Sequence, residues 1–79
     1  MHEEPGATVG VIGAGSFGTA IANLLAENVD VWLFSRHPRQ VETINRDRVN
    51  QQVPIADRVT AIGSYEAIAN QCQLIFPIV

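Results

Sequence analysis

Three glycines at a fixed spacing are the feature of this sequence best suited to chemistry. Residues 13–18, Gly-Ala-Gly-Ser-Phe-Gly, have the pattern G-x-G-x-x-G between an apolar run and a segment with helical periodicity. In that context Gly13 permits a tight turn, Gly15 lets the backbone approach a pyrophosphate, and Gly18 lets the helix pack closely on the strand. The free N–H groups and the positive end of the helix dipole then favour an anion. The pattern therefore predicts a dinucleotide diphosphate site, and the alternative is a tight turn that binds nothing.

The residues about 20 positions further on indicate which dinucleotide is preferred. A site selective for NAD places Asp or Glu there to hold the ribose 2′-hydroxyl, whereas this chain has Ser35, Arg36 and His37. A guanidinium can bind a 2′-phosphate through two hydrogen bonds, and a carboxylate would repel it. We therefore expect NADP(H) to be favoured over NAD(H), with Arg36 on the phosphate. The alternative for Arg36 is a solvated loop cation, and His37 either joins it or only flanks Pro38.

The elements that must position these residues alternate along the chain. Apolar patterning predicts strands at 8–12, 29–34, 58–62 and 74–79, with helices at 16–27, from Pro38, and from Ser64 to Cys72. The segment 45–56 is polar and is interpreted as a helix end and a loop. This order predicts an α/β fold, the first half of a Rossmann-type parallel sheet with helices on both faces and strand order 3-2-1-4. Pro77 fits the last strand only at a sheet edge.

Several further residues are interpreted as structural. The first helix is expected to bury one apolar stripe, formed by Phe17, Ala20, Ile21, Leu24 and Leu25. Core packing is expected for Trp32, Phe34 and Tyr65, and Cys72 is read as a small buried residue in preference to a nucleophile. The segment 46–48, Arg-Asp-Arg, is expected to be a solvated charge cluster unless the adenine side of the cofactor reaches it.

Composition excludes several classes of function. The chain has 79 residues and a net charge of −3, with five arginines and no lysine, so it lacks the basic surface of a nucleic-acid-binding protein. One cysteine excludes an internal disulfide and is compatible with a cytoplasmic location. No run is long and apolar enough to predict a membrane anchor, and no metal-ligand spacing or catalytic Ser/His pairing is present.

The ends of the sequence bear on domain organisation. Residues 1–7 are expected to be a flexible lead-in, and residues 8–79 the first part of an NAD(P)-binding domain. Because the sequence stops within an apolar run, we expect an N-terminal fragment of a longer protein whose substrate domain is absent.

Three stretches of the sequence closely resemble one enzyme family, the bacterial NAD(P)-dependent glycerol-3-phosphate dehydrogenases. They are residues 10–22 (GVIGAGSFGTAIA), residues 32–38 (WLFSRHP) and residues 44–50 (INRDRVN). The resemblance extends over most of residues 8–79. It implies cytoplasmic reduction of dihydroxyacetone phosphate to sn-glycerol 3-phosphate for phospholipid synthesis. It also implies cofactor contacts at Ser16, Phe17 and Arg36, with His37 beside them.

The same resemblance implies that catalytic lysines and the groups that bind the phosphorylated substrate lie further along the chain, so we assign no catalytic residue here. The parent enzyme is expected to act as a homodimer, and the 79 residues alone are expected to be inactive. Two alternatives remain open from the sequence. One is another Rossmann reductase, similar to ketopantoate reductase, and the other is a non-catalytic nucleotide-sensing module.

Overall fold

The computed structural model of the protein describes residues 8–78. Its elements in chain order are β1 (Thr8–Ile12), α1 (Ser16–Leu25), β2 (Asp30–Phe34), α2 (Pro38–Asp47), β3 (Val49–Asn50), β4 (Val53–Pro54), β5 (Val59–Ile62), α3 (Tyr65–Gln71) and β6 (Leu74–Pro77). The expectation for residues 1–7 lies outside the described residues. No helix among the described residues is long and apolar enough to cross a membrane.

Four of the strands form one parallel sheet in the order β5-β2-β1-β6. Numbered as the four main strands of the chain, this is the predicted order 3-2-1-4, and the predicted fold class is confirmed. The chain adds β2 and β5 on one side of β1 and then crosses to place β6 on the other side. Pro77 pairs with Ile12 in β6, the edge strand, where its missing N–H removes no bond of an interior ladder.

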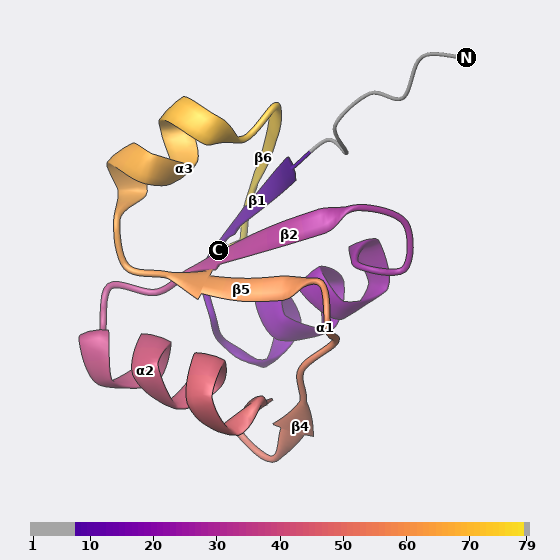
Figure 1. Cartoon of the computed structure of the whole chain (residues 1–79), viewed down its shortest axis with the longest axis vertical. Coiled ribbons are helices and arrows are strands. Elements are labelled where there is room, and N and C mark those ends of the chain that lie inside the picture. The colour runs from indigo at the N-terminus through magenta and orange to yellow at the C-terminus, as the bar shows by residue number, and fades with distance from the viewer. Residues whose placement is uncertain (1–7, 79) are drawn as a thin grey trace.

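Helices cover both faces of the sheet, as Figure 1 shows, with α1 and α2 on one face and α3 on the other. The residues that β1, β2 and β5 direct toward α1 and α2 are fully buried and form the core with Ile44 of α2. They are Val11, Val31, Leu33, Val59 and Ala61. Among the described residues, only the seven-residue α3 covers the opposite face, where it buries Ile68 against Gly10. Trp32 faces that side in register with Gly10 and is only half-buried.

The predicted buried stripe of α1 is wrong. Phe17 is 66% exposed and Leu24 is 61% exposed, and Ala20 is also exposed. The helix instead buries the small residues Gly18, Thr19 and Ala22, and its C-cap Ala26 is buried as well. A Cβ on Gly18 would lie 1.8 Å from the carbonyl oxygen of Gly13. At Gly18 the helix thus lies too close to the turn at Gly13 for any side chain. Of the predicted apolar stripe, Ile21 and Leu25 pack against the core.

The polar segment 45–56 has more structure than its composition predicts. Helix α2 continues to Asp47 and ends at Arg48, which takes the left-handed conformation with φ 59°. The antiparallel pair β3–β4 follows, joined by Gln51 and Gln52, both at positive φ. Neither turn residue is Gly or Asn, so the usual sequence signature of such a hairpin is missing.

Tyr65 does not belong to the core, contrary to expectation. It is the first residue of α3 and is 57% exposed. Its ring packs edge-on against Phe34 with 6.1 Å between ring centres, so both rings lie at the rim of the sheet. Phe34 itself is half-buried, and so is Cys72, whose thiol pKa is raised by desolvation. A raised pKa lowers the thiolate fraction at neutral pH, in keeping with a structural role for Cys72.

Candidate nucleotide site at the ends of the strands

A pocket of about 390 Å³ lies where the parallel strands β1 and β2 end. Its wall includes residues of the glycine-rich turn, the loop after β2, helix α2, the β3–β4 turn and the residue after β6. They are Ile12, Gly13, Ala14, Gly15, Phe34, Ser35, Arg36, His37, Gln40, Gln51 and Ile78. The chain places β2 and β5 on one side of β1 and then β6 on its other side. Ligands of open α/β sheets bind beside the strand at which the order changes sides in this way.

The turn between β1 and α1 has a geometry that requires glycine. Gly13 has φ +120°, a conformation that other residues rarely adopt, and its N–H donates to the carbonyl of Phe34 in β2 (3.3 Å). Gly18 lies beneath the turn against the Gly13 carbonyl. Gly15 differs from both, because a Cβ there would meet no atom within 4 Å. The space above Gly15 is thus open to a ligand.

The start of α1 offers hydrogen-bond donors to that space. Gly15 is the N-cap, and no side chain caps the helix. The N–H groups of Ser16, Phe17 and Gly18 lie in the first turn, where no preceding helical carbonyl can accept from them. The first turn also has no acidic residue. Unpaired N–H groups and the positive end of the helix dipole together make this end of the helix attractive to an anion.

The loop after β2 forms the other side of the pocket. Ser35 is buried, and its Oγ accepts a hydrogen bond from the backbone N–H of His37 (3.1 Å). The side chains of Arg36 and His37 are exposed at the pocket wall. Within the described residues Arg36 makes no ion pair, and the lining includes no Asp or Glu. The wall can therefore accept a second phosphate.

The structure brings four of the seven predicted site residues to one pocket, namely Gly13, Gly15, Arg36 and His37. Ser16 and Phe17 are exposed at the start of α1 next to the turn and are not part of the lining. Gly18 is buried and acts through the packing of α1. The assignment of all seven to cofactor binding remains a prediction.

Sequence reasoning missed three residues, Gln40, Asn50 and Gln51. Gln40 and Gln51 line the pocket, and Asn50 is buried behind the turn. A single glutamine on a polar helix gives no signal of such a position. Asn50 lies within residues 44–50, one of the stretches that resemble the family. Its place in that stretch is the signal that could have identified Asn50 as a candidate.

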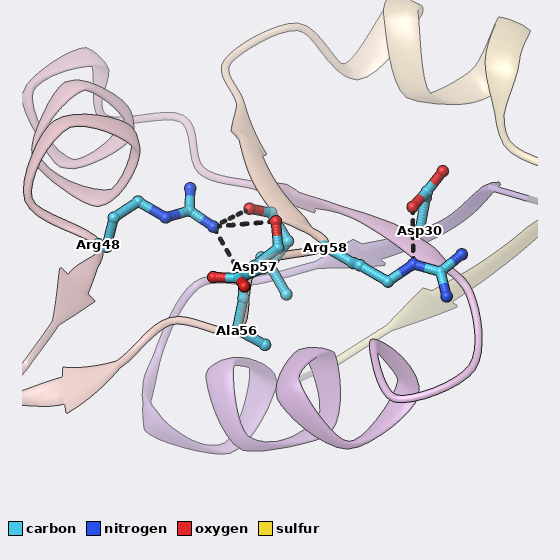
Figure 2. Close-up of polar contacts among 6 residues, drawn as sticks. Asp30, Arg48, Ala56, Asp57 and Arg58 are labelled. Atoms are coloured by element: carbon cyan, nitrogen blue, oxygen red, sulfur yellow. Dashed lines mark hydrogen bonds and ion pairs between the residues drawn. The ribbon is translucent and has the colours of Figure 1, made fainter.

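The predicted charge cluster at residues 46–48 is correct only in part. Arg46 and Asp47 form an exposed ion pair of 3.0 Å, which raises the pKa of Arg46 and lowers that of Asp47. Arg48 instead turns inward, as Figure 2 shows. Its Nη2 donates to the carbonyls of Ala56 and Val59, each at 2.7 Å, and more distantly to Asp57 at 3.5 Å.

Arg48 has a left-handed backbone, and its side chain reaches Val59, the first residue of β5. Arg48 therefore links the β3–β4 hairpin, and the residues that follow it, to β5. On the opposite side of the same segment Arg58 pairs with Asp30 at 2.9 Å, and both partners are partly exposed (Figure 2).

The chain is similar in sequence to known glycerol-3-phosphate dehydrogenases. Residues 8–79 match the family described as NAD-dependent glycerol-3-phosphate dehydrogenase N-terminus. A glycerol-3-phosphate dehydrogenase [NAD(P)+] of Pseudomonas fluorescens is 39% identical over 96% of this chain and 23% of its own length. The Pseudomonas aeruginosa enzyme of the same name is 44% identical over 86% of this chain and 22% of its own length.

A solved structure shows the same fold. The crystal structure of glycerol-3-phosphate dehydrogenase from Coxiella burnetii superposes with a TM-score of 0.83 and 26% identity, over 94% of this chain and 24% of that one. The chain thus spans roughly a fifth to a quarter of the length of these relatives. By its sequence over residues 8–79 and by its fold, the chain belongs to the family formed by the N-terminal part of the NAD-dependent glycerol-3-phosphate dehydrogenases.

Proposed function

We propose that this chain holds the diphosphate and adenosine part of NADP(H) in an sn-glycerol-3-phosphate dehydrogenase. The observation that carries the proposal is the pocket at the ends of β1 and β2. On one side of it lie Gly15 and the uncapped N–H groups of α1, and on the other side lies Arg36, with no Asp or Glu among the described residues that line the pocket. The open space above Gly15 and the first turn of α1 suit a diphosphate.

The two sides of the pocket have different tasks in this proposal. The N–H groups of Gly15 and Ser16 bind the diphosphate, which is common to NADPH and NADH, and Phe17 lies beside them. Arg36 binds the 2′-phosphate of NADPH through its guanidinium, with His37 as its neighbour. NADP(H) is therefore preferred, and NAD(H) binds the same turn more weakly.

The reaction proposed for the full-length protein is reduction of dihydroxyacetone phosphate to sn-glycerol 3-phosphate for phospholipid synthesis, in the cytoplasm. When bound, the cofactor supplies the hydride that is added to the ketone carbon. Residues 8–79 orient the cofactor. The proton donor and the groups that bind the substrate phosphate are placed outside the 79 residues, in a substrate domain, and the full-length enzyme is proposed to be a homodimer.

Titration of the full-length protein with each dinucleotide tests the proposal, followed by assay with dihydroxyacetone phosphate. We expect NADPH to bind more tightly than NADH, and NADPH to be oxidised only when dihydroxyacetone phosphate is added. Oxidation with ketopantoate and not with dihydroxyacetone phosphate would support the reductase alternative. Tight dinucleotide binding without turnover of either substrate would instead support a nucleotide-sensing module.

A further inference from the structure

The carbonyl of Ala14, in the middle of the glycine-rich turn, points into the protein and accepts hydrogen bonds from two side-chain amides. Asn50 Nδ2 donates to it at 2.9 Å, and Gln40 Nε2 donates at 3.0 Å. Asn50 comes from the short strand β3 and is only 6% exposed, and Gln40 comes from α2. Side chains from α2 and β3, 26 and 36 positions away from Ala14 in the chain, thus fix the orientation of this peptide group.

The orientation of that peptide group determines where the next N–H points. In a trans peptide the C=O of one residue and the N–H of the following residue point in opposite directions, and the described residues have no cis peptide bond. Because the Ala14 carbonyl is held toward Asn50 and Gln40, the N–H of Gly15 points away from these two side chains, and Gly15 lies in the pocket wall with open space beside it. No hydrogen bond among residues 8–78 uses this N–H.

Further hydrogen bonds make this arrangement rigid. Asn50 Nδ2 also donates to Thr19 Oγ1 (2.8 Å), and Thr19 Oγ1 donates to the Gly15 carbonyl (2.8 Å). Gln40 Nε2 donates to Asn50 Oδ1 (3.1 Å), while Gln40 Oε1 accepts from Ser35 Oγ. No buried side-chain nitrogen or oxygen of the described residues lacks a partner. A polar network in which every buried atom has a partner specifies one geometry.

We propose that Asn50 and Gln40 are positioning residues that aim the Gly15 N–H at the diphosphate of the dinucleotide. The inference rests on the proposed function, since it assumes that the turn binds a diphosphate. Neither side chain has to touch the diphosphate for this role. The effect should therefore be the same for NADPH and NADH, and it should be absent for a ligand that has no diphosphate.

Gln40→Met and Asn50→Ala in the full-length protein test the inference. The first keeps the length of a half-buried side chain and removes its donors, so it provides a folded variant if the second is unstable. The ligands are NADPH, NADH and 2′-AMP, which carries adenosine and the 2′-phosphate without a diphosphate. Asn45→Ala is the control, because Asn45 makes a comparable pair of amide bonds to the Ala61 backbone (2.9 and 2.8 Å) outside the pocket lining.

We expect each variant to raise the Kd of NADPH and of NADH by about tenfold, the order of one or two lost hydrogen bonds. The Kd of 2′-AMP should change by less than about twofold, and Asn45→Ala should leave all three values nearly unchanged. An unchanged Kd for NADPH in folded Gln40→Met, or an equal loss for NADPH and 2′-AMP, would overturn the inference while the proposed function stands. If the unaltered protein binds neither dinucleotide, the proposed function fails and the inference fails with it.

Discussion

The two sides of the pocket present different chemical groups to a ligand. The glycine-rich turn presents backbone N–H groups, and its conformation is fixed by Gly13, by Gly18 and by the side-chain amides of Gln40 and Asn50. The loop after β2 presents the exposed side chains of Arg36 and His37, and Ser35 holds its backbone through the N–H of His37. The turn, whose backbone is held in one conformation, suits the diphosphate that all dinucleotides share. The loop, with its exposed side chains, suits the 2′-phosphate that distinguishes NADPH from NADH.

This difference has a consequence for substitutions. Changes on the backbone side should affect NADPH and NADH alike, and those that disturb packing should also destabilise the fold. Changes in the loop should alter the preference between the two cofactors and leave stability intact. Four predictions, in order of decreasing effect on dinucleotide binding, test whether the two sides separate in this way.

Gly18→Ala should have the largest effect. Its Cβ would lie 1.8 Å from the Gly13 carbonyl oxygen, a backbone atom that cannot move without displacing the turn. We expect a loss of about 3 kcal/mol or more in the free energy of unfolding and no measurable binding of either dinucleotide. Thermal unfolding and ligand titration measure both. A variant as stable as the unaltered protein would contradict the close packing of α1 on β1.

Gly15→Ala is the matched change on the open side of the same turn. Gly15 has φ −80°, which alanine adopts readily, and its added Cβ would meet no protein atom within 4 Å. Stability should therefore stay within about 0.5 kcal/mol, while the methyl group keeps the diphosphate from the backbone and weakens both dinucleotides by about a hundredfold. Retained affinity would show that the diphosphate does not lie over Gly15.

Arg36→Ala should separate the two cofactors. Removing a charge-assisted pair of hydrogen bonds to the 2′-phosphate should raise the Kd of NADPH by about 30-fold, whereas that of NADH should change by less than about twofold. Arg39→Ala is the control, because Arg39 is also exposed at the start of α2 and does not line the pocket. Equal losses for both dinucleotides would assign Arg36 to the shared part of the cofactor.

Arg48→Ala should have the smallest effect on binding, because Arg48 supports the hairpin segment without reaching the pocket. Loss of its bonds to the Ala56 and Val59 carbonyls should cost about 2 kcal/mol of stability and weaken both dinucleotides by less than about threefold. Arg46→Ala provides the comparison, since its partner Asp47 is exposed and the Tm should not move measurably. Similar Tm losses in the two variants would contradict the anchoring role of Arg48.

The features that the sequence predicted correctly depend on local patterns. The apolar runs, the glycine spacing and Pro38 at the start of α2 report on neighbouring residues, and they were enough for the order of elements and the strand order. The same reasoning placed Gly13, Gly15, Arg36 and His37 at one pocket, because the carboxyl ends of adjacent parallel strands meet there.

The features that it missed depend on contacts between distant residues. The buried side of α1 could not be inferred from apolar spacing. The helix packs on the turn so closely that a Cβ on Gly18 would lie 1.8 Å from the Gly13 carbonyl oxygen, and Phe17 and Leu24 stay exposed. Asn50 looked like a loop residue until the fold placed it against Ala14, 36 positions away in the chain. Tyr65 followed a helical stripe, yet α3 begins at that residue and leaves it at the rim.

A crystal structure of the full-length protein with NADPH would show whether the turn between β1 and α1 binds the diphosphate. We expect diphosphate oxygens at about 3 Å from the backbone nitrogens of Gly15 and Ser16, and the 2′-phosphate at the guanidinium of Arg36. A dinucleotide bound elsewhere, with the turn between β1 and α1 free of phosphate, would contradict it.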